Sequence, residues 1–235
     1  MFILIGFPFL ILFILGLRII SSNIKQLSKT VSLSLLGFWI VALLTVVFAG
    51  IDIGTSDAYN GTKIETYPLN LSSKDTLFLK MVNDDELYFQ DKLRRSTKRI
   101  KVEDNGVKKI YATNVKVSVE KSNTKKFTFK IRKVSEGKNK NKATENAAKI
   151  DYHYSIKNST LELNSFFLSQ LNHRSSDEIV YVTIYVPERN VLFIDSSSHS
   201  FLYRIKNSNN LYHGDVTNHF FEMTDKGLNC TDCIN

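Results

Sequence analysis

Cys230 and Cys233 are the two cysteines of the 235-residue chain and form a C-x-x-C pair near the carboxyl end of the sequence. Thiols at this spacing can form a local disulfide, ligate a shared metal ion, bond to another chain or perform thiol–disulfide exchange. In redox enzymes the pair lies at the start of a helix that follows a strand, whereas here turn-forming residues 225–227 precede it. We therefore favour a structural disulfide or an inert pair. Shared metal or intermolecular bonding and redox catalysis are the alternatives.

The other reactive residue types form no catalytic or metal-binding group. The five histidines are scattered, and no metalloprotease, nucleophile-elbow or phosphate-loop motif is present. Residues 196–200 place serines beside His199, but adjacency in sequence is not triad geometry, so we interpret them as a polar loop. We interpret residues 84–86 as a solvated acidic turn, because the calcium-loop signature is missing. We therefore predict a protein that is not an enzyme, with no catalytic residues, no metal and no cofactor.

A second group with binding potential is a basic segment. Residues 92–101 contain six basic side chains, which are Lys92, Arg94, Arg95, Lys98, Arg99 and Lys101. We do not expect nucleic acid as a partner, because the segment belongs to a domain that we place outside the cytoplasm. Anionic lipid head groups or acidic envelope polymers are more accessible ligands. The simpler interpretation is a solvated edge strand whose charges discourage aggregation.

These residues follow an N-terminal region of a different composition. Residues 1–50 contain no Asp or Glu and only three basic residues. Apolar runs cover 2–17 and 31–50. A bilayer core of about 30 Å requires about 20 helical residues, which the second run supplies and the first reaches by extending to about residue 20. A cleaved signal peptide would need a basic start and a small-residue cleavage site. The sequence thus predicts a transmembrane hairpin over 1–54, with helices at about 2–20 and 31–50.

The orientation of this hairpin follows from its three basic residues. Arg18, Lys25 and Lys29 lie in or beside the connector between the two apolar runs. Cytoplasmic loops collect Lys and Arg, so we expect the connector to face the cytoplasm. The N-terminus and residues 55–235 are then expected on the extracytoplasmic side of the membrane.

Residues 55–235 carry the two-residue periodicity of β-strands. Alternating or short apolar segments cover 76–82, 115–120, 126–131, 160–164 and 180–186, and turn-forming residues occupy 83–85, 104–106, 158–159, 187–190 and 225–227. Residues 142–149 are rich in helix formers and predict two helical turns. Many strands with little helix predict a single all-β domain, either a sandwich or a β-solenoid.

The order of these features, together with short sequence strings, resembles the C-terminal part of PspC-domain (phage-shock-protein C) membrane proteins of Gram-negative bacteria. The strings lie at 16–18, 35–39, 48–50, 58–62, 75–77, 79–81, 148–152, 184–187 and 228–233. The resemblance covers nearly the whole chain. In that family a small PspC domain precedes the helices, whereas this sequence begins inside the first apolar run. We therefore expect an upstream coding segment, or a split or truncated member.

The resemblance implies a LiaF-like transmembrane region and an exported "toastrack" β domain that takes part in envelope-stress sensing or regulation. It implies no catalytic residues. We predict a multi-pass inner-membrane protein whose periplasmic domain works by binding a protein partner in the inner membrane or periplasm, or a second copy of itself. The alternatives are a passive surface or adhesive module that binds anionic envelope polymers or lipids through the basic segment, and a thiol oxidoreductase that uses Cys230 and Cys233.

Overall fold

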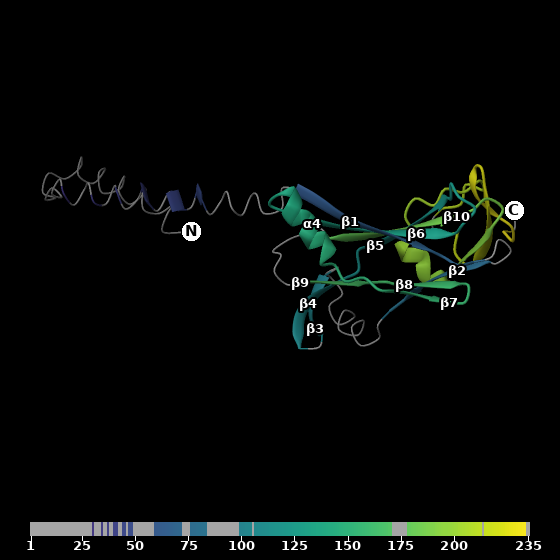
Figure 1. Ribbon diagram of the computed structural model, residues 1–235, viewed down its shortest axis with the longest axis horizontal. Coiled ribbons are helices and arrows are strands. Elements are labelled where there is room, and N and C mark those ends of the chain that lie inside the picture. Colours follow the sequence, from purple (N-terminus) through teal and green to yellow (C-terminus); the bar gives the residue numbers. More distant parts are fainter. Residues whose placement is uncertain are drawn as a thin grey trace, which may run out of the picture. The chain divides into compact units, whose positions relative to one another are not determined.

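The computed structural model describes residues 59–71, 76–83, 99–104, 106–170, 178–212 and 214–233, together with single positions between 30 and 48. The chain divides into two compact units, Met1–Ser56 and Asp57–Asn235. The second unit is a mostly β-sheet domain whose described residues include one short α-helix and one 3-10 helix (Figure 1). The predicted β-rich domain with a short helix is thereby confirmed.

The elements of this domain follow one another with short connections. They are β1 (Tyr59–Pro68), β2 (Leu77–Val82), β3 (Arg99–Asp104), β4 (Val107–Ala112), β5 (Val115–Lys121), β6 (Thr128–Gly137), α4 (Lys140–Ala148), β7 (Tyr154–Lys157), β8 (Thr160–Asn164), β9 (Phe167–Gln170), β10 (Ile179–Val186), β11 (Val191–Ile194), the 3-10 helix η1 (Ser196–Phe201), β12 (His219–Thr224) and β13 (Gly227–Cys230). Each of the five strand segments predicted from alternation coincides with or falls largely within β2, β5, β6, β8 or β10. The predicted helix over 142–149 is α4, shifted by one or two residues.

The strands form two larger sheets and one small sheet. The four-stranded sheet has the order β1-β6-β10-β5, the six-stranded sheet β13-β12-β11-β2-β8-β7, and the three-stranded sheet β3-β4-β9. The chain passes repeatedly between the two larger sheets, so strands distant in sequence pair in parallel: β5 with β10, and β2 with both β8 and β11. Tight antiparallel hairpins, such as β12–β13, complete the six-stranded sheet.

The two larger sheets share one hydrophobic core. Alternate side chains of β6 and β10 are buried, including Phe129, Ile131, Val182 and Ile184, and the core continues through buried residues of the six-stranded sheet. This two-residue alternation leaves the intervening side chains of the same strands on the outer face. The small sheet packs around a separate cluster that includes Tyr111 and Phe166, whose rings stack at 4.8 Å.

One charged group reaches the inner face of the four-stranded sheet. Lys133 is nearly buried, and its Nζ lies 3.5 Å from Oε2 of Glu65, which also accepts a hydrogen bond from the Tyr67 hydroxyl at 3.1 Å. Burial, aided by the neighbouring Glu65 carboxylate, raises the pKa of Tyr67 to about 12. Tyr67 therefore remains a neutral donor to this carboxylate across the physiological pH range.

Helix α4 packs on two glycines at one end of the four-stranded sheet. The side chain of Asn139 caps the helix by accepting a hydrogen bond from the backbone N–H of Lys142 at 2.8 Å. A Cβ atom added at Gly137 would lie 2.6 Å from the backbone nitrogen of Ala143, and one added at Gly61 would collide with the backbone of the same helical turn. Asn146 fixes the contact by donating to the carbonyl of Glu136 at 2.9 Å. Figure 1 shows α4 against β1 and β6, at the end of the domain opposite the C-terminus.

The described residues of the first unit are few. They are Thr30, Ser34, Gly37, Ile40, Val41, Leu44, Thr45, Val47 and Phe48, and all of them are helical and exposed. Two hydroxyls donate to the carbonyl four residues earlier, Ser34 to Thr30 at 2.9 Å and Thr45 to Val41 at 2.8 Å. In the part of the chain that the structure describes, no helix combines the length and the apolarity needed to cross a bilayer. The helix predicted over 2–20 lies outside the described residues.

We expect Gly61→Ala and Gly137→Ala each to lower the free energy of unfolding by about 3 kcal/mol or more, because the added methyl group forces α4 away from the sheet. Urea unfolding of the full chain in neutral micelles, followed by circular dichroism, measures the loss. Thr62→Ala is the matched control, since Thr62 is exposed on the outer face of the same strand. A loss below about 1 kcal/mol for both glycine variants would contradict this packing.

Candidate functional site

Most of the residues singled out from the sequence lie outside the described part of the chain. These are the topology residues Arg18, Lys25 and Lys29, and four of the basic residues, Lys92, Arg94, Arg95 and Lys98. Arg99 begins β3, and Lys101 follows in the same strand with an exposed side chain. Because β3 is an edge of the three-stranded sheet, at least this end of the basic segment belongs to an edge strand.

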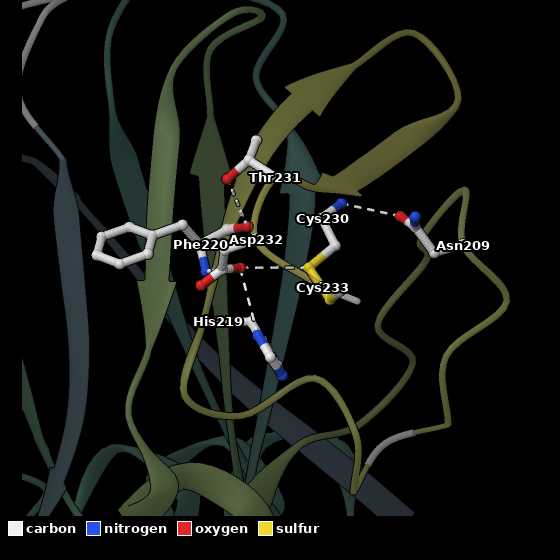
Figure 2. Close-up of polar contacts among 7 residues, drawn as sticks. All are labelled: Asn209, His219, Phe220, Cys230, Thr231, Asp232 and Cys233. Atoms are coloured by element: carbon white, nitrogen blue, oxygen red, sulfur yellow. Dashed lines mark hydrogen bonds and ion pairs between the residues drawn. A yellow bond between two sulfur atoms is a disulfide. The ribbon is translucent and has the colours of Figure 1, made fainter. Parts of the chain in front are cut away.

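Cys230 and Cys233 form a disulfide at the end of β13. Hydrogen bonds hold the loop on both sides: the backbone N–H of Cys230 donates to Oδ1 of Asn209 at 2.8 Å, and Thr231 donates from its backbone N–H and its hydroxyl to the carbonyl of Phe220 (Figure 2). The disulfide therefore closes the loop that follows β13 against β12 and the 207–211 loop.

An acidic side chain lies between the two cysteines and faces the disulfide. Oδ1 of Asp232 accepts a hydrogen bond from the backbone N–H of Phe220 at 3.0 Å and lies 3.3 Å from Nδ1 of His219 (Figure 2). The Sγ atom of Cys230 lies 3.4 Å from the same oxygen. Asp232 is thus fixed by β12 and cannot rotate away without losing three contacts.

The ligand-type atoms of His219, Cys230, Asp232 and Cys233 all lie within 4.8 Å of one another. Two thiolates, an imidazole and a carboxylate are ligand types that zinc accepts. In the disulfide, however, both sulfurs are bonded to each other and neither is a thiolate. The carboxylate beside the Cys230 sulfur also disfavours a thiolate, unlike the positive surroundings that activate redox cysteines. The arrangement therefore fits a structural closure better than thiol chemistry.

A second arrangement was not found from the sequence: a row of alternating cationic and tyrosine side chains on the outer face of the four-stranded sheet. It consists of Arg132, Tyr181, Lys116, Tyr203 and Arg204, and we call it the cation–tyrosine ladder. The first three belong to neighbouring strands, because Tyr181 of β10 is opposite Arg132 of β6 on one side and Lys116 of β5 on the other. Their sequence neighbours are buried in the core, so these side chains emerge on the outer face.

Tyr203 extends the ladder beyond the last strand of the sheet. Leu202 forms a parallel bridge with Val117 of β5, and the backbone N–H of Tyr203 donates to the Val117 carbonyl at 2.7 Å. The side chains of Leu202 and Ile205 are buried and anchor this segment. The segment thereby acts as a short fifth strand that positions Tyr203 and the exposed Arg204.

Each tyrosine ring of the ladder lies near two cations. The Arg132 guanidinium lies 4.1 Å and the Lys116 ammonium 5.6 Å from the Tyr181 ring centre. Lys116 and Arg204 both lie 5.0 Å from the Tyr203 ring centre. Exposed contacts of this kind contribute about 0.5–1 kcal/mol each. They hold long, flexible cationic side chains upright in a fixed row.

The ladder cations are not neutralised by carboxylates of the described residues. None of Lys116, Arg132 and Arg204 forms an ion pair with a described residue. The acidic residues of the same strands are Glu120 and Glu136, each four residues from a ladder cation and therefore about 13 Å away along its strand. That separation exceeds the screening length of about 8 Å at physiological salt. The centre of this face is therefore positively charged.

Alternation alone indicates that Tyr181 and Lys116 point away from the core, because β5 and β10 have valine or isoleucine at every second position. It does not indicate which strands are neighbours. The pairing of β10 with β5 joins residues about 65 positions apart, as in the hydrogen bond from Ser118 to Thr183 at 3.1 Å. The ladder therefore becomes visible only when the sheet register is known.

Comparisons with known proteins give two family matches and one structural match. Residues 1–57 match the PspC transmembrane region, and residues 102–235 match the toast-rack domain found in some PspC proteins. None of the curated proteins compared with the chain matches it. A crystal structure of a candidate cell adhesion protein from Clostridium sporogenes is 14% identical, with a TM-score of 0.26, over 57% of this chain and 46% of that one. The match thus spans less than half of that protein, and we base no argument on it.

We expect replacement of both cysteines by serine to lower the free energy of unfolding by about 2 kcal/mol, the chain-entropy estimate for so short a loop. Urea unfolding in neutral micelles measures this change. In the unmodified protein, neither cysteine should react with maleimide until a dithiol reductant is added. Rapid labelling of both thiols without reductant would contradict a structural disulfide. Insulin reduction that disappears in Cys230→Ser would instead support the oxidoreductase alternative.

Proposed function

Because the chain belongs to the family of PspC membrane proteins, with a PspC transmembrane region followed by a toast-rack domain, we propose that it takes part in sensing or regulating envelope stress. The observation that carries the proposal is the order of these two parts in one chain. It joins a membrane anchor to a mostly β-sheet domain, and the two matched families are membrane regulatory domains. The protein acts by binding and not by catalysis.

The proposed topology is a transmembrane hairpin over 1–54 and an exported domain over 55–235. Arg18, Lys25 and Lys29 support it, since they concentrate positive charge at the connector, which is typical of the cytoplasmic side. The N-terminus and the β domain then face the periplasm of a Gram-negative cell. An exported location also agrees with the disulfide between Cys230 and Cys233, because disulfides persist in oxidising compartments.

In the proposed mechanism, the β domain binds a protein partner or a second copy of the chain, and the two helices transmit that occupancy to the membrane or the cytoplasm. The domain has a single well-packed core that includes both larger sheets, so it offers rigid surfaces for recognition. Among the described residues, the most strongly organised surface is the cation–tyrosine ladder.

A passive binding module for anionic envelope polymers or lipids is the second candidate function. Two observations favour it: the positive outer face of the four-stranded sheet, and the exposed Lys101 in the edge strand β3. Changing Arg94, Arg95, Lys98 and Arg99 to glutamate separates the two functions. A passive module would lose binding to anionic vesicles or wall polymer while the stress response stays intact.

The topology predicts that alkaline phosphatase fused after Asn235 is active, because this enzyme folds only after export. The same reporter fused after Lys25, in the connector, should be inactive, and β-galactosidase should show the reverse pattern at both positions. Measuring both enzymes in whole cells tests the orientation. A phosphatase fusion after Asn235 that is inactive, with an active β-galactosidase at that position, would overturn it.

The proposed function predicts that deleting the gene changes growth or the activity of an envelope-stress reporter under detergent, antibiotic or secretion stress. A chromosomal copy that lacks residues 55–235 should reproduce the deletion, because the proposed sensor is the β domain. Reintroducing the full gene, or the Thr62→Ala variant, should restore the response. An unchanged response to all three stresses in the deletion strain would count decisively against a role in envelope stress.

A further inference from the structure

We propose that the cation–tyrosine ladder is a binding site for an acidic polysaccharide. The acidic groups of the polymer contact Arg132, Lys116 and Arg204, and its hydroxyl groups contact the neighbouring tyrosines, serine and threonines. This inference rests on the proposed function, since it gives the exported domain a ligand of defined chemistry in the envelope.

The spacing of the cations suits a repeating anion. Arg132 and Lys116 stand on either side of Tyr181, two strand spacings apart, or about 9–10 Å. Lys130 adds a further cation about 7 Å from Arg132 along β6, and its ammonium lies 5.2 Å from the Tyr185 ring centre. A polymer lying across the strands therefore meets positive charge at intervals, and never a carboxylate, along this row.

Hydroxyl groups occupy the next positions on the same face. Thr183 of β10 is opposite Lys130 on one side and Ser118 on the other, and Thr66 of β1 is opposite Lys130. Ser118 donates to Thr183 at 3.1 Å, which orients both hydroxyls. Together with the hydroxyl groups of Tyr181 and Tyr203, they supply the neutral donors and acceptors that sugar hydroxyls require.

Other anionic partners fit this face less well. A peptide that adds a strand to a sheet needs a free edge, and the segment that contains Tyr203 already occupies the β5 edge. A peptide or lipid anchored by apolar groups needs an apolar pocket, but the side chains of the ladder and the hydroxyl row are all polar or amphipathic. The cations also stack on the tyrosine rings, so the charged ends and the hydroxyl groups remain for the ligand.

The test uses the full chain in neutral detergent micelles and titrates polygalacturonate, with dextran as the uncharged polymer, poly-glutamate as the acidic peptide and glycerophosphoglycerol as a lipid head group. We expect polygalacturonate to bind, dextran not to bind, and the other two anions to bind at least about tenfold more weakly. Binding should weaken as salt rises from about 0.02 M to 0.15 M. Equal affinity for poly-glutamate or for the lipid head group would overturn the assignment to a polysaccharide.

The variant that tests the site is Lys116→Gln/Arg132→Gln/Arg204→Gln, which should weaken polygalacturonate binding about a hundredfold. Lys138→Gln/Lys140→Gln/Lys149→Gln is the charge-matched control on exposed residues in and beside α4, and should change the affinity less than threefold. Tyr181→Phe/Tyr203→Phe keeps both rings, so folding is preserved, and should cost about five- to tenfold through the lost hydroxyl groups. Equal losses in the ladder and control variants would show unspecific charge attraction and overturn the site.

This result is distinguishable from failure of the proposed function. A chain that does not bind polygalacturonate but still restores the stress response of the deletion strain would refute the ladder as a polysaccharide site and leave the proposed function standing. A chain that binds as expected, in a strain whose deletion has no phenotype, would support the site and refute the role in envelope stress.

Discussion

Strand β10 lies between an antiparallel neighbour, β6, and a parallel neighbour, β5, and its register with both is fixed by the burial of Val180, Val182 and Ile184. A slip of one residue would turn these side chains outward and place Tyr181, Thr183 and Tyr185 in the core. The register that builds the core is therefore also the register that aligns Arg132, Tyr181 and Lys116. The outer surface of the sheet cannot be rearranged without unfolding its interior.

The two ends of the domain are closed in different ways. At one end, Gly61 and Gly137 let the backbone of α4 approach the four-stranded sheet, so the contact depends on the absence of side chains. At the other end, the disulfide and the carboxylate of Asp232 fasten the last described residues to β12. Between these closures the core is continuous, which suits a domain that presents rigid surfaces and has no need of a moving lid.

Local pattern was sufficient to predict much of this fold. Alternation predicted strands such as β5, β8 and β10, and composition predicted α4, because burial on one face and helix propensity are properties of neighbouring residues. Sheet order was not predictable in this way, since parallel partners such as β2 and β8 are separated by long stretches of chain. The same limit hid the ladder, whose members come from four segments, and the approach of His219 to Asp232. Cys230 and Cys233 were identified because their spacing is local.

The segment around Tyr203 also governs how copies of the domain can assemble. By occupying the open side of β5, it leaves β1 as the remaining border of the four-stranded sheet. Pairing through one border joins two molecules and then stops, because neither partner offers a second border for growth. Crowded on a surface, such domains would form closed pairs through this sheet and not extended fibres, so local concentration could rise without runaway polymerisation.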